Sequence, residues 1–389
     1  MTTTTTAPNL AANKGENPLQ GLLAYGQSPW LDYIRRNILL NGDLKKMIAN
    51  DGLRGMTSNP AIFEKAITAG DDYNDIVKTP EAKSSTAMAL YEKIAIRDVQ
   101  DAADIFGPVH QETKGRDGYV SLEVSPNLAF DTQATLEEAR RLWKTVNRPN
   151  VMIKIPGTPQ GVPAIRQALE EGININITLL FAQSAYEEVA EAYIGALEAR
   201  VKKGQDISRI ASVASFFVSR IDSLVDSTID TKLKTEVDST KKALLESLHG
   251  KVAIANARRT YARYQEIIAT PRWKALAVKG AHTQRLLWAS TSTKNPKYRD
   301  VLYVEELIGA DTVDTVPPAT FDAFRDHGKL RNSLTENVAG ANKTMSDLEA
   351  AGISMKEVTD KLLADAVKLF QDPFKQLLDA ITKHAGVSA

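Results

Sequence analysis

The chain has 389 residues, 43% of them hydrophobic, which is enough to bury a sizeable core in one large domain or two ordinary ones. Lysine plus arginine total 48 and aspartate plus glutamate total 48, so the net charge of zero provides no general basic field to attract nucleic acid or an anionic membrane. The absence of cysteine excludes disulfides, thiolate catalysis and cysteine-ligated metal clusters, and it fits a reducing cytoplasm.

The first 18 residues are rich in threonine and have no apolar core, so they predict a flexible leader and not a secretory signal. No run of about 18 apolar residues predicts a membrane span. The five histidines show no HExxH spacing, and we expect no metal site.

Short strand-like runs then alternate with helix-like runs. Apolar residues at helical spacing predict helices over 35–51, 60–70, 85–113, 135–146, 161–172 and 183–204. A long charged helical region follows over about 222–282, and the chain ends in helices such as 356–370. Eight strand candidates separate these segments: 28–34, 53–59, 119–125, 151–156, 173–181, 209–222, 285–293 and 311–318.

Alternating strands and helices favour parallel strands joined by right-handed crossovers. The predicted fold is a (β/α)8 barrel forming one domain over 19–389, with a helical insertion over about 222–282 and extra C-terminal helices over about 330–389. A doubly wound open sheet is the alternative. That fold normally carries a glycine-rich phosphate loop, and neither GxGxxG nor GxxxxGK[ST] occurs here.

The segment VMIKIPGT, 151–158, places a lysine inside a predicted strand. Because strands alternate their side chains between two faces, Val151, Ile153 and Ile155 share one face and Lys154 takes the other. If the apolar face meets the outer helices, Lys154 points into the barrel. Lysine is rarely buried without a function or a partner.

Other strands repeat this pattern near their carboxyl ends, where active sites of barrels lie. The polar residues that alternation would bring to the inner face are Asp32, Thr57, Asn59, Ser121, Glu123, Asn174, Asn176, Thr178 and Ser215. Structural interpretations remain open for several of them. Asn59 before Pro60 suits a helix N-cap, Asn176 and Thr178 could form a buried polar pair, and Glu123 could neutralise Lys154 as an ion pair.

A buried lysine has a defined chemistry. Removal from water favours the neutral amine, which attacks carbonyl groups to form a Schiff base, whereas nearby carboxylates favour the ammonium. For Lys154 to act as a nucleophile, burial must lower the pKa of its amine by more than the Glu123 and Asp32 carboxylates raise it.

Six segments, in order along the chain, resemble motifs of the transaldolase family, in its longer subgroup: GMTSNPAIF, SLEVS, VMIKIPGT, INITLLF, SFFVSR and ASTSTKNP. The resemblance covers most of 30–320. It implies an enzyme of the pentose phosphate pathway without a cofactor. That enzyme would move a dihydroxyacetone unit from sedoheptulose 7-phosphate or fructose 6-phosphate to glyceraldehyde 3-phosphate or erythrose 4-phosphate.

The resemblance also implies roles for individual residues. Lys154 would form the Schiff base, Asp32 would take the proton of the C4 hydroxyl, and Glu123 with Thr178 would hold a catalytic water. Dihydroxyacetone would be bound by Asn59, Ser121, Asn176 and Ser215, with Phe217 beside them. Arg220 and Lys294 would bind phosphate, Lys294 through the match of ASTSTKN. Without the motif, Arg220 would be interpreted as an exposed surface arginine.

Three other functions stay open at this point. A fructose-6-phosphate aldolase of the same superfamily would release free dihydroxyacetone, but such enzymes resemble this chain less at Glu123 and Phe217. A non-catalytic barrel scaffold would be expected to lack the lysine or the carboxylates. A pyridoxal-phosphate enzyme would need a glycine-rich phosphate cup that is not evident. The expected partners are small sugar phosphates, in a cytoplasmic monomer or homodimer.

Overall fold

A computed structural model describes residues 17–68 and 72–387. Most of the predicted leader over 1–18 lies outside these residues, and Pro18 opens the first helix, α1 (Pro18–Gly21). The short turn of 3-10 helix η1 (Leu22–Tyr25) follows and leads into the first strand.

Eight parallel strands close into a barrel, with each strand beside the next along the chain and the last beside the first. This confirms the predicted (β/α)8 barrel and excludes the open sheet. The strands are β1 (Gln27–Asp32), β2 (Gly55–Thr57), β3 (Tyr119–Glu123), β4 (Val151–Pro156), β5 (Ile175–Leu180), β6 (Ser212–Phe217), β7 (Arg285–Ala289) and β8 (Thr312–Val316).

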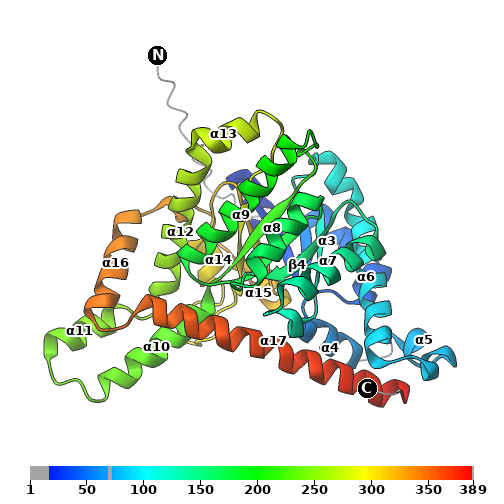
Figure 1. The fold of residues 1–389 in the computed structure, drawn as a ribbon. Coiled ribbons are helices and arrows are strands. Elements are labelled where there is room, and N and C mark those ends of the chain that lie inside the picture. Colours follow the sequence, from blue (N-terminus) through cyan, green and yellow to red (C-terminus); the bar gives the residue numbers. More distant parts are fainter. Residues whose placement is uncertain (1–16, 69–71, 388–389) are drawn as a thin grey trace.

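Helices connect the strands and form the outer layer (Figure 1). Those before β6 are α2 (Arg36–Leu40), α3 (Asp43–Asp51), α4 (Pro60–Thr68), α5 (Asn74–Val77), η2 (Glu81–Ser84), α6 (Ala87–Glu112), η3 (Pro126–Leu128), α7 (Thr132–Val146), α8 (Gly161–Glu171) and α9 (Gln183–Lys202). Their apolar stripes face the strands, as the sequence pattern predicts for each long helix.

The extra helices lie where the sequence predicts them. The insertion between β6 and β7 forms α10 (Ser219–Leu233), α11 (Ser239–Ser247), α12 (Val252–Ala269) and α13 (Pro271–Ala277). The short helix α14 (Leu302–Glu306) precedes β8, and α15 (Pro318–His327), η4 (Ser333–Thr335), α16 (Val338–Ala350) and α17 (Met355–Ala385) follow it.

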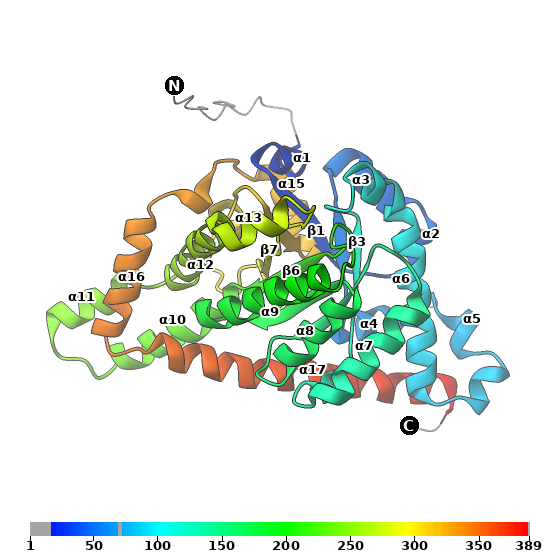
Figure 2. The ribbon, with the colours of Figure 1, turned by 45° about the horizontal axis from the view of Figure 1, so that its top comes forward.

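Helix α17 is the longest of the described helices and does not sit in the outer ring like the others. It runs along one side of the molecule, from α10 and α11 at one end to α4 and α5 at the other (Figure 1 and Figure 2). That side is the carboxyl end of the barrel, because Phe370 of α17 lies over the amine of Lys154.

The opposite end of the barrel is filled by side chains. The Arg285 guanidinium donates to Asp117 Oδ1 at 2.8 Å and to Ser28 Oγ at 2.8 Å. The fully buried Trp30 donates from Nε1 to the same Asp117 oxygen at 3.4 Å. A packed amino-terminal end leaves the carboxyl end as the place for a cavity, as in other barrels. None of the described helices is long and apolar enough to cross a membrane.

Candidate active site

A cavity of about 220 Å³ opens at the carboxyl ends of the strands. Its wall combines strand ends, the loops that follow β2 and β7, and two residues of α17. The predicted site residues that line it are Asp32, Asn59, Lys154, Thr178, Ser215, Phe217, Arg220 and Lys294.

Strand register explains why Glu123, Lys154 and Asn176 meet. Glu123 of β3 pairs in register with Lys154 of β4, which pairs with Asn176 of β5. Side chains at one level of neighbouring strands point to the same face, so all three project inward. A shift of one residue in any of these strands would turn its polar group outward.

Lys154 lies at the floor of the cavity and is only 5% exposed. Its Nζ lies 3.5 Å from Glu123 Oε2 and donates a hydrogen bond to the backbone carbonyl of Ser58 at 3.3 Å. The ion pair that the sequence left open as a structural role for Glu123 is therefore present. The amine also faces the cavity, where it can reach a substrate.

Glu123, which lies beside this amine, and Thr178, which lines the cavity, both have incomplete hydrogen bonding. Both carboxylate oxygens of Glu123 and the Thr178 hydroxyl are buried, and none has a hydrogen-bond partner in the described chain. Burial raises the pKa of Glu123 to about 7, although the Lys154 charge pulls it down. At neutral pH Glu123 can therefore both accept and donate a proton.

Asp32 faces the cavity from the end of β1. Burial raises its pKa, an effect that the charge of Lys154 and a hydrogen bond from Thr57 oppose. The Thr57 hydroxyl donates to Asp32 Oδ1 at 2.8 Å, which fixes the orientation of the carboxylate. A carboxyl group with a raised pKa is suited to general base and acid work near neutral pH.

Ser121, Asn176 and Ser215 form a hydrogen-bonded chain across the barrel. The Asn176 amide nitrogen donates to Ser121 Oγ at 3.0 Å, and the Ser215 hydroxyl donates to Asn176 Oδ1 at 2.7 Å. Ser121 and Asn176 lie below the cavity and only Ser215 lines it. The interpretation of Asn176 and Thr178 as a buried polar pair is wrong, because Asn176 bonds to the two serines instead.

Asn59 has both of the roles that the sequence allowed. It lines the cavity, and its Oδ1 accepts a hydrogen bond from the backbone N–H of Ile62 at 3.0 Å in the first turn of α4. The amide nitrogen is not used by this cap, so one side chain serves helix and cavity together.

Two cationic groups stand at the outer part of the cavity. Arg220 is partly buried, its Nη1 has no hydrogen-bond partner in the described chain, and its guanidinium carbon lies 5.4 Å from the ring centre of Phe217. The alternative interpretation of a surface arginine is therefore wrong. Lys294 donates to Ser292 Oγ at 2.7 Å in the loop after β7.

Some cavity residues were not found from the sequence. Ser290 and Ser292 lie in the wall from the loop after β7, and Leu369 and Phe370 reach it from α17. Ser290 has a left-handed backbone with φ of 58°, which is unusual for serine and directs the loop toward Ser219. For Leu369 and Phe370 the local pattern predicts a helix but gives no sign of what that helix covers.

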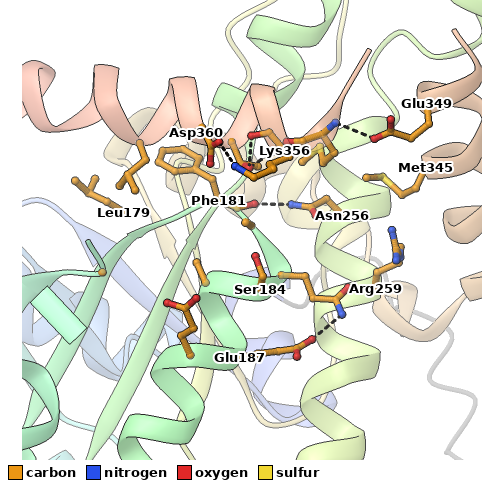
Figure 3. Close-up of a pocket in the computed structure, with 18 of the residues that line it drawn as sticks. Leu179, Phe181, Ser184, Glu187, Asn256, Arg259, Met345, Glu349, Lys356 and Asp360 are labelled. Carbon is orange, nitrogen blue, oxygen red and sulfur yellow. Dashed lines mark hydrogen bonds and ion pairs between the residues drawn. The ribbon is translucent and has the colours of Figure 1, made fainter. Parts of the chain in front are cut away.

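A larger cavity of about 860 Å³ lies beside the first, between α9, α12, α16 and α17 (Figure 3). Its polar groups largely bind one another: Lys356 pairs with Asp360, and the Asn256 amide donates to the Phe181 carbonyl at 2.8 Å. The Phe181 ring packs 5.3 Å from that of Phe217, so this aromatic pair stands between the two cavities. None of the predicted site residues lines the larger cavity.

A closed barrel with a buried amine and two carboxyl groups at its carboxyl end has the form of a barrel enzyme. The family model "Transaldolase/Fructose-6-phosphate aldolase" matches residues 29–381. The chain therefore belongs to the transaldolase/fructose-6-phosphate aldolase family.

Curated relatives agree over nearly the whole length. A "Transaldolase" of Trichodesmium erythraeum is 51% identical over 92% of this chain and 94% of its own. "Transaldolase 2" of a Nostoc species is 47% identical over 94% of this chain and 97% of its own. "Transaldolase" of Thermobifida fusca is 44% identical over 94% and 98%. The expected transferase of aldehyde or ketone residues is thereby confirmed.

Proposed function

We propose that this enzyme transfers a dihydroxyacetone unit from a ketose phosphate, sedoheptulose 7-phosphate or fructose 6-phosphate, to an aldose phosphate, glyceraldehyde 3-phosphate or erythrose 4-phosphate. The observation that carries the proposal is the Lys154 amine, buried at the floor of the cavity with Glu123 3.5 Å away. A lysine in that setting is suited to form an imine with a ketone.

In the first half of the reaction, the Lys154 amine attacks the C2 carbonyl and water leaves, giving a protonated imine. Glu123 and Thr178 bind and relay this water, in keeping with the incomplete hydrogen bonding of their buried oxygens. Asp32 then takes the proton of the C4 hydroxyl. The C3–C4 bond breaks, its electron pair moves toward the imine, and an aldehyde leaves.

In the second half, the three-carbon unit remains on Lys154 as an enamine. Its C3 attacks the carbonyl of the second aldehyde, whose oxygen takes the proton held by Asp32. Hydrolysis of the new imine frees the product and the amine. The serine–asparagine chain supports the dihydroxyacetone hydroxyls at Ser215, and Arg220 with Lys294 hold the phosphate at the outer end of the cavity.

The experiment that tests this proposal is reductive trapping. We expect borohydride with fructose 6-phosphate to add mass to the peptide that carries Lys154. In a coupled assay with erythrose 4-phosphate, Lys154→Met should lose at least about three orders of magnitude in rate because covalent catalysis is removed. Lys294→Met is the matched control for trapping: it removes a second lysine from the cavity wall, and at saturating fructose 6-phosphate the adduct on Lys154 should still form.

Each alternative function has its own result in the same assays. Sustained release of free dihydroxyacetone, with no transfer to erythrose 4-phosphate, would identify a lyase. Failure to trap any adduct, together with unchanged turnover of Lys154→Met, would leave the Schiff-base mechanism without support. Catalysis in the pentose phosphate pathway, in a cytoplasmic monomer or homodimer without nucleic-acid partners, belongs to the same proposal.

A further inference from the structure

Helix α17 places an aromatic ring directly over the reactive lysine. The Lys154 Nζ lies 5.7 Å from the ring centre of Phe370, and both residues line the active-site cavity. Phe370 is 8% exposed, whereas its neighbour Leu369 is 53% exposed at the edge of the same cavity. The ring therefore covers the amine from the side opposite the barrel floor.

Contacts of the residues that follow Phe370 on α17 hold this ring in place. Phe374 is buried and packs edge-on against Tyr91 of α6, with ring centres 5.5 Å apart. The Gln371 side chain donates to the Pro126 carbonyl at 3.5 Å. Phe374 does not line the active-site cavity, but it shares a separate small cavity with Glu123.

This inference rests on the proposed function, in which the three-carbon unit remains on Lys154 as an enamine. The enamine on Lys154 has two possible fates. Its C3 can attack an aldehyde, which is transfer. Alternatively C3 can take a proton from water, and addition of a second water to the resulting iminium releases free dihydroxyacetone and restores the amine. The second fate begins when water protonates C3, and the second water then adds to C2.

We propose that Phe370 is a specificity-determining residue that favours transfer over hydrolysis. An apolar ring beside Lys154 keeps bulk water away from the enamine, so that C3 is not protonated before an aldehyde arrives. The product imine is still hydrolysed, by the water that Glu123 and Thr178 relay. The barrel residues supply the chemistry of imine formation, and α17 supplies the dry cover that preserves the intermediate until an aldehyde arrives.

The test measures the partition between the two fates in the full-length enzyme. With fructose 6-phosphate alone, the rate of release of free dihydroxyacetone is measured. With erythrose 4-phosphate added, the ratio of free dihydroxyacetone released to sedoheptulose 7-phosphate formed is determined. Phe370→Ala should raise this ratio at least about tenfold, which corresponds to about 1.4 kcal/mol of differential barrier. Phe370→Leu, which keeps part of the apolar cover, should lie between Phe370→Ala and the wild type.

Leu377→Ala is the control, because it removes a fully buried side chain from the same helix, two turns beyond the ring, and Leu377 does not line the active-site cavity. It should lower thermal stability and leave the partition ratio at the wild-type value. An equal rise in Leu377→Ala would show that helix docking, and not the ring over Lys154, sets the ratio, and would overturn the inference. A wild-type ratio in Phe370→Ala would overturn it as well.

If Phe370→Ala does not fold, Phe370→Leu decides alone: a raised ratio supports the role and an unchanged ratio overturns it. If the wild type traps no adduct or makes no sedoheptulose 7-phosphate, the proposed function itself has failed, and the effect of Phe370 has lost its premise.

Discussion

Arg220 is the residue whose surroundings are most specific for an anion. Its Nη1 is buried without a partner in the described chain, and its guanidinium lies over the Phe217 ring. A planar guanidinium offers two parallel donors to a phosphate, and a lysine ammonium at the same place keeps only the charge. Replacing Arg220 by lysine therefore tests the need for bidentate phosphate binding while the positive charge is kept.

We expect Arg220→Lys to raise the KM for fructose 6-phosphate about tenfold or more and to change kcat less, because a bidentate contact and the ring contact are both lost. The KM for unphosphorylated fructose should stay the same. Arg259→Lys provides a control in the larger cavity, where the same change should leave both constants unaltered. An unchanged KM for fructose 6-phosphate in Arg220→Lys would assign the phosphate to another group.

Individual site residues could be predicted from the sequence because strand alternation is a local rule. Lys154, Asp32 and Ser215 needed only the parity of their strands to be placed on the inner face. Depth along the barrel is not a local property. It depends on strand tilt and register, and so the sequence did not show that Asn176 lies below the cavity, bonded to two serines.

At the scale of elements, close packing between two strands explains a glycine. Gly55 of β2 pairs in register with Trp30 of β1, and a Cβ on Gly55 would lie 2.4 Å from the Trp30 ring. That ring is fully buried and close to Asp117, so it has little space into which to move. Only a residue without a side chain fits beside it.

Gly55→Ala should therefore lower the free energy of unfolding by about 1–3 kcal/mol, the usual cost of forcing an extra methyl group into a packed interior. Urea denaturation measures this value. Gly195→Ala in α9 is the comparison, because its added Cβ would meet only the end of the flexible Arg166 side chain. We expect that variant to gain stability through better helix propensity, and equal stabilities for the two variants would contradict the packing argument.

The sequence pattern predicts the first part of helix α17 but not its length or its position over the cavity. The apolar spacing over 356–370 predicts a helix, and Pro373 would ordinarily end or bend it. The helix instead continues to Ala385, because Phe374, Leu377 and Ile381 are buried against neighbouring helices. Tertiary packing outweighs the proline here, and the same packing decides that Phe370 lies over Lys154.

At the scale of the whole molecule, the sequence predicts the alternation of elements, the barrel and the positions of the extra helices. The route of α17 across the barrel mouth is set by contacts between segments hundreds of residues apart, such as Gln371 with Pro126. The same packing buries carboxyl groups whose protonation affects the stability of the whole protein. Glu123, Asp222 and Asp314 are buried carboxyl groups, and burial raises the pKa of each to about 7.

Asp314 of β8 allows the effect of one buried carboxyl group on the free energy of unfolding to be measured separately from catalysis. It lies on the face of β8 opposite to Thr315, which lines the cavity, so it is outside the proposed mechanism. Its Oδ1 accepts a hydrogen bond from the Thr291 hydroxyl at 3.0 Å, and its Oδ2 is buried without a partner in the described chain. Burial raises its pKa from 3.8 to about 7, and the Thr291 hydrogen bond only partly opposes this.

Between pH of about 4 and 7 the folded protein thus holds a proton on Asp314 that the unfolded chain has released. A raised folded-state pKa makes the free energy of unfolding fall as pH rises through this window, by up to about 1.4 kcal/mol per pH unit for one group.

Asp314→Asn keeps the Oδ1 acceptor and removes the titration. Its stability relative to the wild type should therefore increase from pH 5 to pH 8 in urea denaturation. Asp379→Asn, the same change at an exposed position of α17, should follow the wild type at both pH values. A constant difference between wild type and Asp314→Asn across this range would mean that Asp314 is ionised in the folded protein throughout.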